Sequence, residues 1–324
     1  MEQQYVLGID VGGTSVKQAV FTVDGNMLKK WSISTDKADN GTNILKDISA
    51  SVNKALSSLK LDKKQFIGAG VGVPGFIDME SGMVDFAVNI GWKKYPIVRI
   101  LSDYLNIPVA VDNDANLAAA GEYWRGAGDG ADDMILFTIG TGVGGGIIVK
   151  GDIVHGVGGM GGEIGHVTVI PEGGAPCNCG KAGCLETVSS ATGIIRLAKE
   201  EAEKNKNSSL YKLWQEKNEL STKDIFELSA AGDQTANVVI EKAMHYLGLA
   251  AANIANVLNP QKIVIGGGVS AAGEQLLIPL RSHYEEYALE RVKADSDFAL
   301  AELGNDAGVT GAAWMAKTYL NEEK

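Results

Sequence analysis

The chain has 324 residues, of which 45% are hydrophobic and 21% are charged, so it has ample apolar material for two packed domains and too little charge for a disordered chain. It carries 29 Lys and Arg against 40 Asp and Glu, and the net charge of -11 argues against nucleic acid as a partner, because a phosphate backbone repels an acidic surface. The first ten residues lack the pattern of a signal peptide, and no apolar stretch reaches the roughly 20 residues of a membrane span, so we expect a soluble cytoplasmic protein without membrane contact.

Strand and helix patterns alternate along the first third of the chain. Residues 5–30 are predicted to form a β-hairpin followed by another strand, and apolar residues at helical spacing predict a helix over residues 42–59. Short buried strands are expected at residues 67–73 and 109–111, and a helix at residues 115–124. This alternation favours layers of the α/β type.

A second run, beginning with a strand at residues 134–138, resembles the first. The segment from Ile9 to Thr14 and the segment from Phe137 to Gly142 both join an apolar strand, a polar residue and a Gly/Thr turn that leads to another apolar strand. Such a weak internal repeat predicts two related halves that face each other across a cleft.

The rest of the chain is predicted to be mainly helical. Helices are expected at residues 192–204, 222–231 and 235–258, the last with Asp233 as its N-cap, and a buried strand at residues 262–265. A helix of small residues near the end of the chain, from Gly308 to Tyr319, is expected to pack back on the first half.

Three glycine-rich segments follow predicted strands: residues 10–17 (DVGGTSVK), residues 138–146 (TIGTGVGGG) and residues 266–268 (GGG). Glycines let backbone N–H groups approach an anion, and the Asp10 carboxylate can hold Mg²⁺ directly or through water. Each segment alone also fits an ordinary turn, but the first two together favour a phosphate site. The third suits close packing of an adenine or a ribose against bare backbone.

Asp114 lies between the end of a strand and the start of a helix, in the segment VDNDAN. In that place its carboxylate can simply cap the helix. It can equally act as the base that accepts a proton from a substrate hydroxyl, with Asn113 orienting that hydroxyl. The residues alone leave both interpretations open.

The most specific pattern is a histidine followed by a tight cluster of the only three cysteines in the chain. His166, Cys177, Cys179 and Cys184 supply one nitrogen and three sulfurs across turn-forming residues, which predicts a closed tetrahedral zinc site of the structural kind. An odd number of close cysteines does not make a disulfide framework. The other histidines, His155, His245 and His283, show no partner pattern and are expected to be structural or solvated.

Six ordered motifs resemble those of the ROK family of bacterial sugar kinases and repressors, and most closely its glucokinases: DVGGTSVK, VDNDAN, TGVGGG, GGEIGH, CNCGKAGCLE and IVIGGGVS. The similarity spans essentially the whole chain. It implies two actin-like ATPase (ribonuclease H-like) α/β domains with an interdomain active-site cleft. We assign the first domain to residues 1–115, completed by the C-terminal helix at about 309–324, and the larger domain with the zinc loop to residues 116–308.

The resemblance also implies roles for individual residues. Asp114 matches the catalytic base, and the further sugar ligands are Asn89, Asn113, Glu163, His166 and Glu186. His166 matches a zinc ligand whose other ring nitrogen faces the sugar. The residues that match nucleotide-binding elements are Asp10, Gly12, Gly13, Thr14, Lys17, Gly140, Thr141, Gly142, Val143, Gly144, Gly266 and Gly267.

The implied activity is phosphorylation of the 6-hydroxyl of glucose by Mg²⁺-ATP, with a structural Zn²⁺ and a homodimeric assembly. The alternatives are a kinase for mannose, fructose, N-acetylglucosamine or N-acetylmannosamine, polyphosphate as the donor, and a non-catalytic sugar sensor or regulator. Because the first strand is expected to begin at Tyr5, the sequence leaves no room for the helix-turn-helix of family regulators, and we expect no direct binding of DNA.

Overall fold

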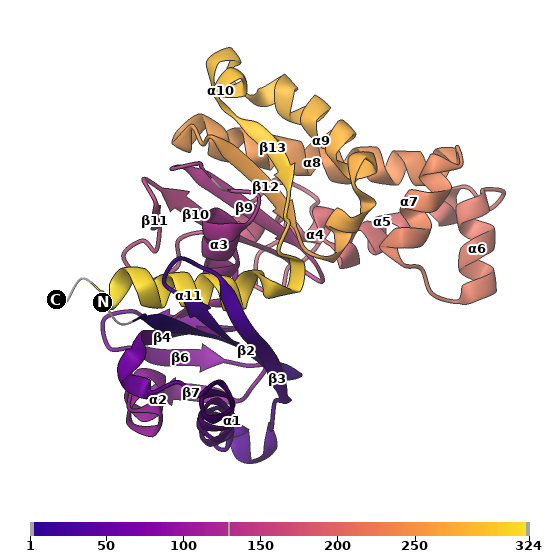
Figure 1. Cartoon of the computed structure of the whole chain (residues 1–324). Helices are drawn as coiled ribbons and strands as arrows, with labels where there is room; N and C mark the ends of the chain where they lie inside the picture. Colours follow the sequence, from indigo (N-terminus) through magenta and orange to yellow (C-terminus); the bar gives the residue numbers. More distant parts are fainter. Residues whose placement is uncertain (1–2, 129, 322–324) are drawn as a thin grey trace.

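The computed structural model describes residues 3–128 and 130–321, which form two lobes with a long helix between them (Figure 1). The first lobe contains a five-stranded sheet of order β3-β2-β1-β4-β8, in which β1, β4 and β8 are parallel and the other two pairs are antiparallel. Its strands are β1 (Tyr5–Val11), β2 (Ser15–Thr22), β3 (Met27–Ser34), β4 (Phe66–Val73) and β8 (Val109–Asn113). The hairpin and both buried strands predicted here are confirmed.

The second lobe repeats this topology. Its five-stranded sheet has the order β11-β10-β9-β12-β13, again with three parallel strands and two antiparallel pairs at one edge. Its strands are β9 (Met134–Ile139), β10 (Val143–Val149), β11 (Asp152–Ile153), β12 (Lys262–Gly266) and β13 (Asp297–Leu300). The repeat inferred from short motifs is therefore a repeat of whole sheets, with the β9–β10 hairpin in the place of the β1–β2 hairpin.

A third, small sheet was not predicted. It has the order β5-β6-β7 and lies between β4 and β8 in the sequence, and its strands are β5 (Phe76–Asp78), β6 (Met83–Ala87) and β7 (Trp92–Tyr95). Ile77, Val84 and Trp92 are buried and join the core of the first lobe. Strands this short give little periodicity, so their pattern in the sequence is weak.

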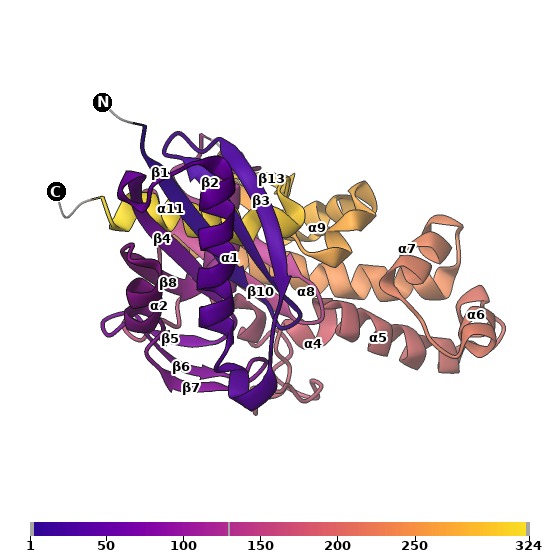
Figure 2. The ribbon, with the colours of Figure 1, turned by 60° about the horizontal axis from the view of Figure 1, so that its bottom comes forward.

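Helices cover both sides of the first sheet. On one side lie α1 (Ile44–Leu59) and α2 (Ile97–Leu105), and on the other side lies α11 (Ala307–Tyr319) (Figures 1 and 2). The helix α3 (Asp114–Arg125) lies between α11 and the strands β9 and β10 of the second sheet. A Cβ atom at Gly8 would come within 2.0 Å of the Val309 carbonyl oxygen, and one at Gly70 within 1.8 Å of the Ala312 oxygen. Glycine on β1 and β4 is thus what allows α11 to pack this closely on the first sheet, as predicted for the helix at the end of the chain.

Most helices belong to the second lobe: α4 (Glu186–Ser189), α5 (Ala191–Lys204), α6 (Ser209–Lys217), α7 (Thr222–Ala230), α8 (Gln234–Leu258), α9 (Glu274–Tyr287) and α10 (Glu290–Asp295). The predicted helices α5, α7 and α8 are confirmed, and the Asp233 side chain accepts a hydrogen bond from the Ala236 N–H as the N-cap of α8. The helices α2, α6, α9 and α10 were not predicted. Among the described residues, no helix is both long and apolar enough to cross a membrane.

Candidate active site

Asp114 lies at the first position of α3, directly after β8. The N-cap of this helix is Asn113, whose Oδ1 accepts hydrogen bonds from the N–H groups of Ala115 (2.8 Å) and Asn116 (3.4 Å). The helix is therefore capped by the preceding residue. Although the Asp114 Oδ1 also accepts from the Ala115 N–H, at 3.0 Å, the Asp114 carboxylate is exposed to the space between the lobes.

Two cavities meet at Asp114. The first, of about 170 Å³, is lined by Gly75 and Phe76 from the first lobe, by Asn113 and Asp114, and by Gly159 and Glu163 from the second lobe. The second, of about 330 Å³, is lined by residues of both predicted hairpins together with the start of α11: Asp10, Lys17, Asp114, Thr138, Gly144, Asn305 and Gly308. One carboxylate thus faces both compartments.

The surroundings of Asp114 weaken its acidity. Although Asp114 is open to the two cavities, the walls of the space between the lobes surround its carboxylate and partly desolvate it, and the charge of Asp10 acts in the same direction. Together they raise the pKa of Asp114 to about 6. A carboxylate tuned this way accepts protons near neutral pH better than an ordinary aspartate does.

Asp10 is the second carboxylate in the wall of the second cavity, beside Asp114. Its Oδ2 lies 3.5 Å from the Lys17 Nζ, which also donates a hydrogen bond of 2.7 Å to the Asn305 carbonyl oxygen. Burial raises the pKa of Asp10, and Lys17 opposes this shift. The N-terminus of α11 faces the same cavity, so its helix dipole favours an anion there. The short turn Gly304–Asp306 before α11 was missed in the sequence because nothing local marks it.

The turns of the two hairpins occupy equivalent places but have different neighbours. In the first hairpin, Gly12 and Thr14 are held by Thr35, whose hydroxyl donates to the Gly12 carbonyl oxygen and whose N–H donates to the Thr14 carbonyl oxygen. A Cβ atom at Gly13 would lie 3.5 Å from the Nζ of Lys37, a cation that the sequence did not reveal, and 3.8 Å from the Cβ of Asn89. Asn89 is exposed beside this turn and does not line either cavity.

The second turn contains Gly140, Thr141 and Gly142 and leans on α5. The Gly140 carbonyl oxygen accepts from the Ala191 N–H, and the Thr141 oxygen accepts from the Thr192 hydroxyl at 2.7 Å. Val143 is buried at the start of β10. Of the predicted phosphate segment, Gly144 lines both cavities that contain Asp114, and Thr138 lines the second of them. Gly140, Thr141, Gly142 and Val143 line neither cavity.

The third glycine segment lies further away, at the end of β12. Gly266 and Gly267 are packed against the second sheet, with Gly267 at a positive φ of 83°. Gly268, the next residue, lines a cavity of about 550 Å³ whose wall includes Phe226 and Glu227 of α7. A flat aromatic base fits a cavity of this kind, between bare backbone and an apolar side chain.

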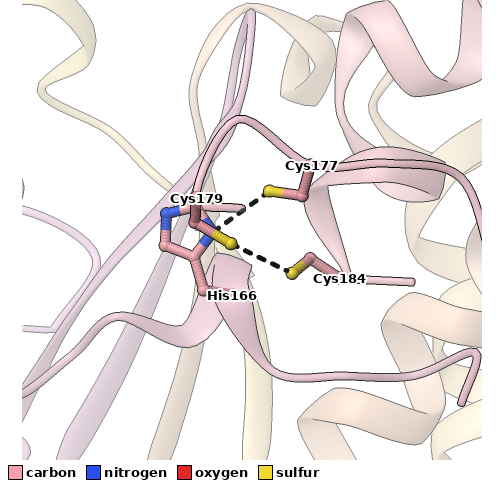
Figure 3. Close-up of side chains that lie close together, drawn as sticks. All are labelled: His166, Cys177, Cys179 and Cys184. Atoms are coloured by element: carbon pink, nitrogen blue, oxygen red, sulfur yellow. Dashed lines mark hydrogen bonds between the residues drawn. The ribbon is translucent and has the colours of Figure 1, made fainter. Parts of the chain in front are cut away.

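The predicted zinc ligands converge, as Figure 3 shows. The His166 Nδ1 lies 3.5 Å from the Cys177 Sγ, the Cys179 and Cys184 Sγ atoms are 3.6 Å apart, and all four ligand atoms lie within 4.8 Å of one another. A tetrahedral zinc ion with Zn–S of about 2.3 Å and Zn–N of about 2.0 Å separates its ligand atoms by roughly 3.5–3.8 Å. The donor set and its spacing therefore fit zinc.

Glu163 and Glu186 flank the cysteine cluster on two sides. The His166 Nε2 points toward the Glu163 Oε2, at 3.8 Å, and Glu163 lines the first cavity. Glu186, at the start of α4, accepts a hydrogen bond of 3.0 Å from the Cys177 thiol and lies beside Gly142. Glu186 faces a separate cavity together with Thr141 and Cys177, so the structure does not place it in the same wall as Asp114.

His155 has a structural role, one of the two that were expected for it, and its partner is a buried carboxylate. Its Nε2 lies 2.7 Å from the Oδ2 of Asp112, a carboxylate that is only 2% exposed, and this contact raises the pKa of His155. The Oδ1 of Asp112 accepts hydrogen bonds from the Asn113 N–H and from the Asn116 side chain. The pair ties the loop after β11 to the segment that carries Asp114. Residues 43 apart in the chain give no local signal of such a contact.

Two related sheets have a cavity between their hairpins, and the wall of this cavity contains the start of a helix and the carboxylates of Asp10 and Asp114. This arrangement defines a two-domain α/β protein of the actin-like ATPase class. The chain belongs to the ROK family, whose model matches residues 6–319.

Individual relatives agree with this assignment over nearly the full chain. The sequence is 52% identical to a glucokinase of Halalkalibacterium halodurans, with 99% of this chain and 97% of the relative covered. A ROK family glucokinase of Streptomyces griseus, solved in complex with glucose and AMPPNP, is 32% identical with a TM-score of 0.74, covering 97% of this chain and 99% of that one. A ROK hexokinase of Thermus thermophilus is 30% identical with a TM-score of 0.80, and 99% of each chain is covered.

Proposed function

We propose that the protein phosphorylates glucose at its 6-hydroxyl with ATP as the donor. The observation that carries this proposal is the position of Asp114, whose carboxylate lines both the first and the second cavity. A base in that place can accept the proton of a sugar hydroxyl in the first cavity. The hydroxyl oxygen can then attack a phosphate held in the second cavity. The high identity to a glucokinase and the likeness to a structure that holds glucose and an ATP analogue support the same substrates.

The second cavity is the proposed site of the ATP phosphates. The N-terminus of α11 and Lys17 supply positive charge, while Asp10 and the Thr138 hydroxyl offer the hard oxygen ligands that Mg²⁺ prefers. When bound, Mg²⁺ neutralises charge on the phosphate oxygens. The adenine is proposed to occupy the cavity between Gly268 and Phe226.

The first cavity is the proposed site of the sugar. Asn113 and Glu163 line it together with Asp114 and present the polar groups that hydroxyls require. The Asn113 Nδ2 already donates to the Gly75 carbonyl oxygen at 3.1 Å, which fixes the orientation of this side chain. His166, Glu186 and Asn89 lie outside the wall of this cavity, and their contact with the sugar stays a prediction that requires the lobes to approach each other.

In the proposed step, the 6-hydroxyl oxygen forms a bond to the γ-phosphorus while the bond from that phosphorus to the β–γ bridging oxygen breaks. The hydroxyl proton passes to the Asp114 carboxylate, and ADP leaves with the electron pair of the broken bond. Phosphoryl transfer depends mostly on positioning and on charge neutralisation, and a general base adds typically about 10²- to 10⁴-fold.

Zinc is proposed to be held by His166, Cys177, Cys179 and Cys184 as a structural ion, because four protein ligands leave no coordination place for water. It would fix the ring of His166, whose other nitrogen faces Glu163 at the sugar cavity. We also expect a homodimer from the family resemblance, which sedimentation analysis would test.

The experiment that tests this function is a coupled ATP-consumption assay that compares kcat/KM for glucose, mannose, fructose, N-acetylglucosamine and N-acetylmannosamine. The expected result is the highest kcat/KM with glucose. A higher value for another sugar would reassign the substrate, turnover with polyphosphate alone would reassign the donor, and glucose binding without turnover would make the protein a sugar sensor.

A further inference from the structure

A second cluster of metal-binding side chains lies between α8 and α9, away from the cavities that contain Asp114. Two residues one turn apart on α8, Glu241 and His245, face two residues on one side of α9, His283 and Glu286. The two helices approach closely here, because a Cβ atom at Gly248 would lie only 2.7 Å from the Cβ of His283. This contact sets His283 directly against α8.

The two ring nitrogens of His283 have different environments. Nε2 lies 3.1 Å from the Glu241 Oε2, within hydrogen-bond distance. Nδ1 is buried and has no hydrogen-bond partner, and the closest carboxylate oxygen, Oε2 of Glu286, is 3.6 Å away. A hydrogen bond from Nε2–H to Glu241 selects the tautomer in which Nδ1 carries a free lone pair.

His245 lies beside His283 and Glu286. Its ring lies 5.1 Å from the ring of His283, nearly perpendicular to it, and one ligand atom each from His245, His283 and Glu286 lie within 4.8 Å of one another. Ligand atoms of a tetrahedral ion bound at about 2.0–2.2 Å are separated by roughly 3.3–3.6 Å, which matches the distance from Nδ1 to the Glu286 oxygen. A carboxylate behind a histidine ligand is also the usual support of such an ion.

We propose that His245, His283 and Glu286 bind a second divalent transition-metal ion, with zinc as the reference ion, and that Glu241 orients His283 from behind. The ion links α8 to α9 on the second lobe. Two imidazoles and one carboxylate leave room for a water ligand, so this site is weaker and more exchangeable than the cysteine site.

The test is equilibrium dialysis of the full-length protein against buffered Zn²⁺, followed by elemental analysis. Wild type is expected to hold one zinc per chain more than His245→Ala and one more than His283→Ala, whatever the occupancy of the cysteine site, since both variants keep the cysteines. Glu285→Gln changes a neighbouring carboxylate of α9 outside the cluster and is expected to bind as wild type does. Glu241→Ala is expected to weaken zinc binding by roughly 10- to 100-fold.

A stability measurement guards against a variant that merely misfolds. Once the cysteine site is filled with zinc, further zinc is expected to raise the Tm of wild type and of Glu285→Gln, and to leave the Tm of Glu286→Gln and of His245→Ala unchanged, with all four sharing the same circular dichroism spectrum. The proposal is overturned if wild type and the histidine variants hold equal zinc, or if Glu285→Gln loses the extra ion as well. Equal zinc would leave His283 as a histidine paired only with Glu241 and Glu286.

Discussion

The two five-stranded sheets share one topology, yet their hairpins carry different chemistry. The β1–β2 hairpin contributes a charged pair, Asp10 and Lys17, to the wall of the second cavity. The β9–β10 hairpin contributes the Thr138 hydroxyl and the bare backbone of Gly144. Asp114, at the start of the helix that follows the first sheet, lies between them. The comparison teaches that the repeat places two equivalent hairpins beside the second cavity. Of these two hairpins, only β1–β2 contributes charged side chains to it.

The largest expected effect comes from the carboxylate between the hairpins. Asp114→Asn should lower kcat for glucose phosphorylation by about 10²- to 10⁴-fold, because the amide cannot accept the hydroxyl proton, while glucose binding is retained. Steady-state kinetics and isothermal titration with glucose measure the two quantities. Asp103→Asn, on the exposed side of α2, serves as the control, and near-normal turnover in Asp114→Asn would refute its role as the base.

The next effect compares the two hairpins directly. Asp10→Asn removes a charged ligand and should raise the KM for Mg²⁺-ATP by roughly 10- to 100-fold, whereas Thr138→Val removes a neutral hydroxyl and should raise it by roughly 2- to 10-fold. Asp24→Asn, in the turn between β2 and β3, is the matched control. An equal rise in the KM for Mg²⁺-ATP in both variants would mean that the charged hairpin contributes no more to nucleotide binding than the uncharged one.

Removal of a zinc ligand is expected to weaken sugar binding more than nucleotide binding. Cys184→Ala should raise the KM for glucose by roughly tenfold, the value of one lost charge-assisted hydrogen bond, with a smaller change in the KM for ATP. Elemental analysis of the same preparation shows whether the zinc is lost. A zinc-free wild type would end the zinc assignment, and an equal rise in both KM values would point to general unfolding of the second lobe.

The smallest effect near neutrality is the dependence on pH. Since the pKa of Asp114 is raised to about 6 and the base must be ionised, kcat/KM should fall tenfold per pH unit below about 6. The effect of pH on the stability of the folded protein has the opposite direction to its effect on kcat/KM. The raised pKa stabilises the folded protein fully below the ordinary value of 3.8, and this contribution is lost as the pH rises through about 6.

A thermal melt distinguishes this second consequence. At pH 8, Asp114→Asn should have a higher Tm than wild type, because the amide removes a carboxylate whose charge the surrounding protein and Asp10 disfavour. At pH 4 the two proteins should melt alike. A lower Tm of the variant at pH 8 would show that the negative charge of Asp114 stabilises the N-terminus of α3 more than desolvation and Asp10 destabilise it.

Much of the candidate site could be predicted because its residues sit in short motifs. The four zinc ligands lie within 19 residues of one another in the chain, and turn-formers between them force their side chains together. The features of the site that could not be predicted depend on contacts between segments that are far apart in the chain. His155 meets Asp112 across the space between the lobes, and Lys37 reaches the turn at Gly13 from beyond β3.

Glu122 illustrates the same limit. This buried carboxylate on α3 accepts hydrogen bonds from the N–H groups of Ala127, Glu302 and Leu303, and so anchors the loop that leads to the phosphate cavity. Glu302 and Leu303 lie 180 and 181 residues from Glu122 in the chain, so no periodicity or spacing marks these contacts.

By itself, the sequence determined the two strand-turn-strand units, the main helices and the residue types that can bind phosphate, sugar and zinc, because backbone preferences and ligand chemistry act over a few residues. Only the tertiary structure decided that Asp114 faces two compartments, that Glu186 and Asn89 lie outside the wall of the sugar cavity, and that two histidines of α8 and α9 face each other. Those placements depend on how closely helices and sheets pack, which glycines such as Gly8 and Gly248 control and which no single segment encodes.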